Sequence, residues 1–151
     1  MNWDSWEVPK NSRIAAETGR TLIRVVGWID FEDPRDLRQL DRLAGTAKFL
    51  GVRPMIQDIP DPDWMLRPGI AWAFDALAER DLTFDALGFP LHLDNFHRLL
   101  TRHPDLRVVI DHGMKPRLRD HGTDPAAFDH WAAGMTRLAR DTAAVCKLSG
   151  L

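Results

Sequence analysis

Five apolar segments alternate along the chain with segments of helical periodicity. The apolar segments, rich in Val, Ile, Leu and Phe as buried strands are, cover residues 22–30, 49–57, 82–87, 106–110 and 143–151. Between them, apolar side chains recur every three or four positions, as they do along one face of a helix. These stripes are Leu37, Leu40, Leu43 and Ala44; Ile70, Phe74, Leu77 and Ala78; Phe96, Leu99 and Leu100; and Phe128, Trp131, Met135, Leu138 and Ala139. The pattern predicts four strand–helix units and a fifth strand.

Helix-starting residues precede each stripe. Asp33, Asp94 and Asp124 offer side-chain caps, while Pro34, Pro68 and Pro125 suit a first helical position. A further short helix is predicted over residues 12–19, ending at Gly19. Residues 1–12 form an N-terminal arm that the pattern does not place.

Strands separated by amphipathic helices at these intervals predict an α/β fold with parallel strands covered by helices. Periodicity alone leaves open whether the sheet closes into a barrel or stays open. The sequence contains no Gly-rich phosphate loop, which argues against a nucleotide-binding doubly wound fold. A length of 151 residues corresponds to one domain or part of one.

Composition excludes several classes of partner. A hydrophobic fraction of 44% and a charged fraction of 28% are typical of globular proteins, and a net charge of -2 gives no basic surface for nucleic acid or an anionic membrane. No apolar run reaches membrane-spanning length, and the first residues lack the apolar core of a signal peptide. The single cysteine, Cys146, cannot form an internal disulfide. We therefore expect a cytoplasmic protein.

The segment Leu106 to Pro116 carries the candidate chemistry. An apolar strand leads directly into Asp111 and His112 and then into a loop, which is how a parallel strand ends at an active site. A period of two places His112 on the face of Val108 and Ile110. His112 is then a candidate metal ligand or general acid/base, or simply a histidine hydrogen-bonded in a loop. The Asp-rich loop 58–63 matches no calcium-binding spacing.

Three blocks of sequence follow one another in a recognisable order. They are residues 51–58 with 61–63 and 66–68, the motif Asp111-His112-x-x-Lys115-Pro116, and residues 146–151. In this order and spacing they resemble the amidohydrolase-related family, in particular its branch of sugar-lactone hydrolases and 2-pyrone-4,6-dicarboxylate lactonase. The resemblance covers residues 13–151.

The resemblance implies a partial (β/α)8 TIM barrel that holds the family's third to seventh strands, with catalytic groups at their carboxyl ends. It implies that His112, after the sixth strand, polarises the substrate carbonyl or helps hold a divalent metal. It also implies substrate-binding positions. These are Arg53 and Gln57 on one face of the fourth strand, His92 in the loop after the fifth, Lys115 in the motif of His112, and Lys147 and Ser149 on the seventh strand.

Departures from the family pattern change the expected activity. The sequence has no His-x-His pair and no eighth strand with an aspartate, and Phe89 stands where many relatives have Arg or Lys. We expect a hydrolase acting on a small-molecule lactone of a sugar acid or similar carboxylate, impaired in this truncated chain. The alternatives are a non-catalytic barrel remnant that associates with itself or with a complementing fragment, and a decarboxylase. Because His112 and His92 alone do not close a metal site, we expect no metal and no other cofactor on this chain.

Overall fold

Five parallel strands form a sheet in the order β1-β2-β3-β4-β5. The computed structural model describes residues 24–120 and 122–150. The strands are β1 (Val25–Gly27), β2 (Phe49–Val52), β3 (Thr83–Ala86), β4 (Arg107–Ile110) and β5 (Val145–Cys146). Because each strand pairs with the next one along the chain, the carboxyl ends of all five lie at the same edge of the sheet. The predicted parallel α/β fold is confirmed.

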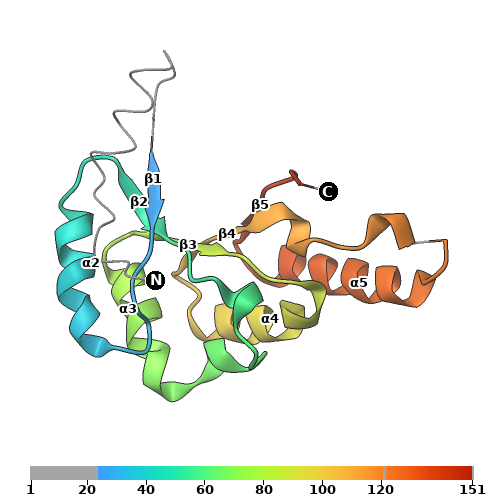
Figure 1. The fold of residues 1–151 in the computed structure, drawn as a ribbon, viewed down its shortest axis with the longest axis horizontal. Coiled ribbons are helices and arrows are strands. Elements are labelled where there is room, and N and C mark those ends of the chain that lie inside the picture. Colours follow the sequence, from blue (N-terminus) through green and yellow to red (C-terminus); the bar gives the residue numbers. More distant parts are fainter. Residues whose placement is uncertain (1–23, 121, 151) are drawn as a thin grey trace, which may run out of the picture.

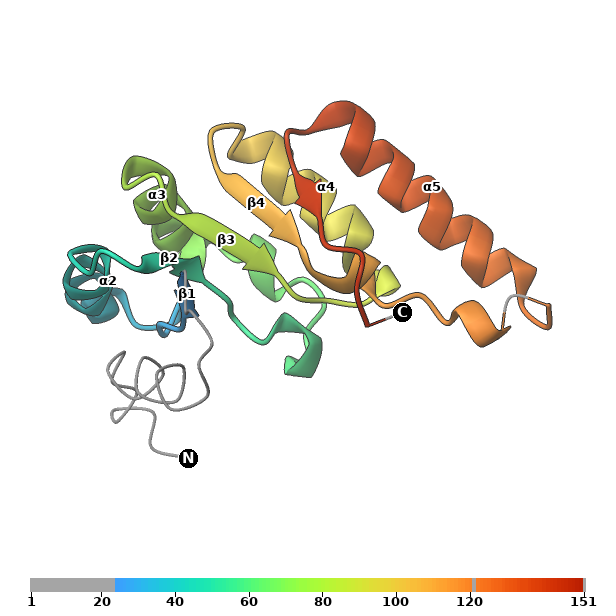
Figure 2. The same cartoon turned by 90° about the horizontal axis from the view of Figure 1, so that it is seen from above.

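Four helices connect the strands, as the apolar stripes predicted. They are α2 (Leu37–Ala44), α3 (Ala71–Glu79), α4 (Leu93–Arg102) and α5 (Pro125–Asp141). Figures 1 and 2 show these helices on one side of a curved sheet, and no helix of the described residues covers the other side. In the described part of the chain, no helix is long and apolar enough to cross a membrane. The predicted arm 1–12 and helix 12–19 lie outside the described residues.

Two of the three predicted helix caps are confirmed. Asp33 accepts a hydrogen bond from the backbone N–H of Arg35 at 3.0 Å, and Asp124 accepts one from Ala127 at 3.1 Å. The prediction for Asp94 is wrong. A 3-10 turn at Pro90–His92 has already turned the chain into α4, so Asp94 lies inside the first helical turn and pairs with Arg137 of α5.

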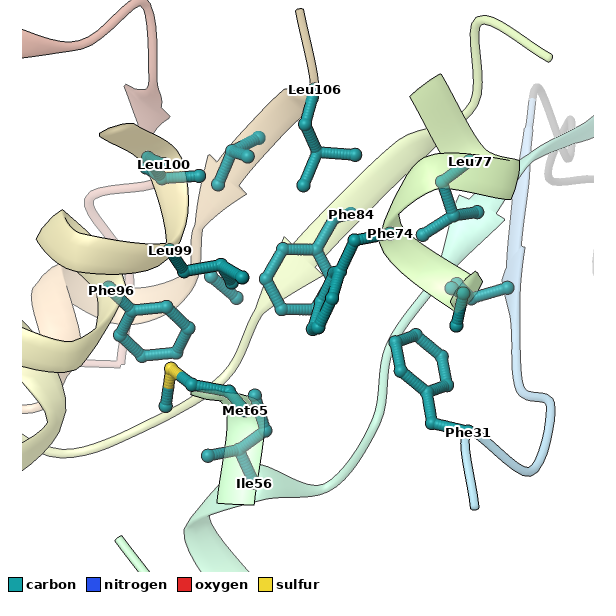
Figure 3. Close-up of a cluster of buried hydrophobic side chains, with 14 of the residues drawn as sticks. Phe31, Ile56, Met65, Phe74, Leu77, Phe84, Phe96, Leu99, Leu100 and Leu106 are labelled. Atoms are coloured by element: carbon teal, nitrogen blue, oxygen red, sulfur yellow. The ribbon is translucent and has the colours of Figure 1, made fainter. Parts of the chain in front are cut away.

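The hydrophobic core lies between the sheet and its helices. Neighbouring rings link the segment after β1 to α4, with centroid distances of 5.3 Å for Phe31–Phe74, 5.2 Å for Phe74–Phe84 and 6.2 Å for Phe84–Phe96 (Figure 3). Each helical stripe contributes buried side chains to this core, which confirms the helical spacing; Ala139 is exposed. Burial of a large apolar side chain of this kind stabilises a fold by about 1.5–3 kcal/mol.

Strand β2 is shorter than predicted and lies unusually close to β3. It ends at Val52 rather than residue 57, because Pro54 has no N–H for the ladder and Ile56–Asp58 form a 3-10 turn. At Gly51, a Cβ atom would lie 1.8 Å from the carbonyl oxygen of Thr83, so only glycine fits there. Strands β1, β3 and β5 also end before their predicted limits, since the chain leaves the sheet at its carboxyl edge, whereas β4 ends at Ile110 as predicted.

Candidate active site

Four charged side chains from four neighbouring strands meet at the carboxyl edge of the sheet. Arg53, directly after β2, places Nη2 2.5 Å and Nε 3.1 Å from Oδ2 of Asp85 in β3. Lys147, directly after β5, donates from Nζ to Oδ1 of Asp111 at 2.8 Å and to Oδ2 of Asp85 at 3.2 Å. We call these four residues the ion cluster. It links β2, β3, β4 and β5 on the side of the sheet that faces away from the core.

The ion cluster is balanced in charge and buried on its acidic side. The side chains of Asp85 and Asp111 are 2% and 0% exposed, whereas those of Arg53 and Lys147 are 30% and 43% exposed. Two cations and two anions cancel, as buried carboxylates require. Partial burial works against the charged form of Lys147, but its hydrogen bonds to Asp111 and Asp85, together with their negative charges, outweigh this effect and hold the pKa of Lys147 above its ordinary value of 10.5.

One carboxylate oxygen in the cluster has an ion-pair partner but no hydrogen bond. Nε of Arg53 lies 2.8 Å from Oδ2 of Asp111, yet its N–H points to Asp85 instead. This Oδ2 therefore accepts no hydrogen bond from any residue in the described ranges. Within the ion cluster, Asp111 thus accepts a hydrogen bond only from Lys147, at Oδ1, whereas Asp85 accepts hydrogen bonds from both cations.

A second polar group lies at the same edge of the sheet. Lys115 donates from Nζ to Oε1 of Gln57, and the same ammonium lies 5.5 Å from the centre of the Phe89 ring. Gln57 sits on the 3-10 turn after β2, not on a strand face as predicted, because β2 has already ended. The ring face of Phe89 therefore attracts the ammonium of Lys115, whereas an arginine or lysine at position 89 would repel it.

His112 and Ser149 form the third polar group. Nδ1 of His112 lies 2.9 Å from the carbonyl oxygen and 3.0 Å from the hydroxyl oxygen of Ser149. A carbonyl oxygen can only accept, so Nδ1 carries a hydrogen and a neutral ring has its lone pair on Nε2. Gly150 lies directly against the ring, since a Cβ atom there would come 3.1 Å from Nδ1. The second nitrogen is therefore the one available for chemistry.

His112 reaches this position through a left-handed turn. Its φ is 51°, and Gly113, Met114 and Lys115 follow with φ of 54°, 61° and 51°. The predicted alternation through His112 is wrong, because β4 ends at Ile110 and only its residues alternate. Val108 and Ile110 face the core. Left-handed geometry costs a non-glycine residue about 1–2 kcal/mol, so this run of four residues, three of them not glycine, must be held by its surroundings.

His92 is not brought to these groups. Its side chain is 3% exposed and lies inside the loop after β3, where Nδ1 accepts a hydrogen bond from the backbone N–H of Phe89 at 3.0 Å. Burial holds the pKa of His92 below its ordinary value of 6.5. The observed contacts of His92 are those of a residue that shapes the loop, and its substrate-binding role stays a prediction.

Sequence reasoning missed Asp85, to which both cations of the ion cluster are bonded. The signal was present, because an aspartate in the middle of the apolar segment 82–87 must be paired when it is buried. Asp111 was recognised as part of the motif but not as a partner of Arg53 and Lys147. Four of the predicted site residues do lie at one edge of the sheet. Arg53 and Lys147 belong to the ion cluster, and Gln57 pairs with Lys115.

The described residues do not form a metal site by themselves. In ranges 24–120 and 122–150, no three His, Cys, Asp or Glu side chains are arranged to hold a metal ion. Asp85 and Asp111 are neutralised by Arg53 and Lys147, and His112 offers one nitrogen. The absence of a metal or other cofactor on this chain stays a prediction.

Comparisons with known proteins identify the family of the chain. The amidohydrolase family model matches residues 9–151. The chain is 40% identical over 127 residues to an L-fucono-1,5-lactonase of Burkholderia ambifaria, covering 84% of this chain and 42% of that protein. It is 34% identical to an L-fucono-1,5-lactonase of Burkholderia multivorans, with coverages of 86% and 44%. The chain thus spans less than half the length of these relatives.

A solved structure shows the same fold. The crystal structure of an amidohydrolase from Burkholderia multivorans with bound HEPES superposes with a TM-score of 0.82 at 30% sequence identity, covering 95% of this chain and 50% of that one. The five parallel strands and their helices therefore correspond to part of a (β/α)8 barrel, which confirms the predicted partial barrel. On the family match and these relatives, the chain belongs to the amidohydrolase family.

Proposed function

We propose that the carboxyl edge of the sheet hydrolyses a lactone of a sugar acid. The observation that carries this proposal is the pairing of His112 with Ser149 beside a balanced ion cluster, on the edge where barrel enzymes bind their substrates. The names of two relatives, both L-fucono-1,5-lactonases, support a cyclic ester as the substrate class. In the proposal, His112 is the catalytic residue.

The proposed reaction follows from the ring nitrogens of His112. With a hydrogen on Nδ1 facing the Ser149 carbonyl, Nε2 accepts a proton from the water that attacks the lactone carbonyl carbon. The imidazolium then returns a proton to the ring oxygen as the C–O bond breaks, which gives a hydroxy acid. Lys115, bonded to Gln57 through one of its three donors, supplies positive charge for the oxyanion and for the carboxylate product.

Kinetic assays of L-fucono-1,5-lactone hydrolysis test the proposal. Acid release is followed with a pH indicator against spontaneous hydrolysis in buffer, for the wild-type chain and for His112→Ala. We expect the wild-type chain to exceed the buffer rate and the variant to lose roughly 100-fold or more of that enzymatic rate, the typical size of general acid/base catalysis.

His103→Ala is the matched control for this assay. His103 also pairs through Nδ1, 3.0 Å from a carboxylate oxygen of Asp75, but it lies at the carboxyl end of α4 rather than at the carboxyl edge of the sheet. A wild-type rate equal to the buffer rate, or equal losses in both variants, contradicts the proposal. Release of carbon dioxide from an aromatic acid without lactone turnover favours the decarboxylase alternative.

A second candidate function is association with another copy of the chain. The edge strand β5 and the segment after it expose apolar side chains, with Val145 60% and Leu148 81% exposed. An edge strand of this kind favours pairing with another chain. Sedimentation of a monomer at all accessible concentrations contradicts this candidate.

The expected compartment remains the cytoplasm, where an exposed lone thiol such as Cys146 stays reduced.

A further inference from the structure

The left-handed turn from His112 to Lys115 is held at Gly113 from two directions. The N–H of Gly113 donates to the carbonyl of Lys147 at 3.1 Å, and the N–H of Lys147 donates to Ile110 at 2.9 Å, which ties the turn to β5. The carbonyl of Gly113 instead accepts a hydrogen bond from Nε1 of Trp131 on α5, at 2.7 Å. A helix that contributes no side chain to the ion cluster thus contacts the residue next to His112.

Contacts outside the turn fix helix α5, which carries Trp131. One turn further along α5, Gly134 lies so close to α4 that a Cβ atom would come 2.8 Å from Cδ1 of Leu93. Leu138, one turn beyond that, is 1% exposed, and the start of α5 is fixed by the Asp124 cap. The backbone that carries the Trp131 indole is therefore held in place by contacts that do not involve the turn.

We propose that Trp131 is a positioning residue for His112. By holding the Gly113 carbonyl, the indole keeps the turn left-handed, and the turn keeps Nδ1 of His112 against the Ser149 carbonyl. The ring then presents Nε2, with its lone pair, to the open edge of the sheet. The effect of Trp131 on catalysis rests on the proposed function. Its effect on the geometry of the His112 ring can be tested without any reaction.

Nitrogen-15 spectra of the His112 ring, assigned with a His112→Gln variant, test the inference. Trp131→Phe keeps an aromatic ring and removes the N–H donor. Trp72→Phe is the matched control, since the indole of Trp72 is also partly buried and donates to a backbone carbonyl, that of Phe31, at 3.0 Å. At mildly alkaline pH we expect a hydrogen on Nδ1 in the wild type and in Trp72→Phe, and signals averaged between the two ring forms in Trp131→Phe.

Kinetics supply the second measurement. We expect Trp131→Phe to lower kcat for lactone hydrolysis roughly tenfold with little change in KM, as the loss of one positioning hydrogen bond would do, and Trp72→Phe to leave both unchanged. If Trp131→Phe does not fold, benzothienylalanine at position 131 keeps the shape of the indole with sulfur in place of N–H, and the same shifts are expected.

The two measurements separate this inference from the proposed function. Wild-type ring signals for His112 in a folded Trp131 variant overturn the positioning role, whatever the kinetics. Equal changes in the Trp72 and Trp131 variants overturn it as well, because they would reflect general loosening. Altered ring signals confined to the Trp131 variant, in a chain that hydrolyses no lactone, support the positioning role and contradict the proposed function.

Discussion

Phe84 and Asp85, adjacent residues of β3, lie in two different environments. Phe84 points into the core between Phe74 and Phe96, among the buried apolar side chains of this cluster (Figure 3). Asp85 points to the opposite side of the sheet, where Arg53 and Lys147 bind it. Both side chains are almost completely buried, at 0% for Phe84 and 2% for Asp85. One side of the sheet is held by apolar contact and the other by charge.

Two equally buried residues can differ in the substitutions that they tolerate. On the helix side, the free energy depends on the volume and area of side chains, so an apolar residue of similar size is tolerated. On the other side it depends on matched charges, because removing one partner leaves the others buried without compensation. The stability of the fold therefore depends mainly on the helix side, and the polar side holds the residues of the candidate site.

The largest expected effect is on the helix side. Phe84→Ala removes a fully buried ring that contacts two others, so we expect the free energy of unfolding to fall by about 3–5 kcal/mol. Urea unfolding followed by circular dichroism measures it. Leu148→Ala, at a side chain 81% exposed, should change it by no more than about 0.5 kcal/mol. Similar losses in the two variants would contradict the placement of the core.

A smaller loss is expected on the polar side. Asp85→Asn leaves Arg53 and Lys147 with a neutral partner; breaking a fully buried pair costs about 3–5 kcal/mol, and the partial exposure of both cations lowers our expectation to about 2 kcal/mol. The same urea experiment measures this loss. Adding Lys147→Met to Asp85→Asn should lose less than the sum of the two single variants. Strict additivity would mean that the two residues do not interact.

The smallest effect is a dependence on alkaline pH. The pKa of Lys147 is higher in the folded chain than its ordinary value of 10.5, so its ion pairs stabilise the fold fully below about 10.5. As the pH rises above 10.5 and through the folded value, the unfolded chain loses its proton first and this contribution disappears. Unfolding midpoints measured across this range should decline less steeply for Lys147→Met than for the wild type. Parallel declines would exclude the ion pairs as the cause.

The fold followed from the sequence because local signals and packing agreed. Helical stripes such as Phe74 and Leu77 point to the core as their spacing predicts, and Asp124 caps α5 as its place before Pro125 indicates. Strand ends were harder to predict, since Met55 and Ile56 continue the apolar character of the segment after β2 has ended at Val52. Pro54 marked that end, because it cannot donate to a ladder.

The site followed from the sequence only in part. The resemblance identified His112, Lys147 and Arg53, all of which lie at the carboxyl edge, but alternation put His112 on the wrong face. His112 instead lies in a left-handed turn, which is held by Trp131 and Lys147. These residues lie 19 and 35 positions after His112 in the sequence. No local pattern encodes such a turn, because its stabilising contacts come from other elements.

The close contact of β2 and β3 at Gly51 gives this position an influence beyond its size. A methyl group there would meet the Thr83 carbonyl at 1.8 Å and would have to wedge the two strands apart. Arg53 and Asp85 stand two residues further along those same strands, so the wedge would also pull a guanidinium from its carboxylate. A single added carbon, on a residue outside the ion cluster, would thereby disturb both the pairing of the strands and the geometry of the cluster.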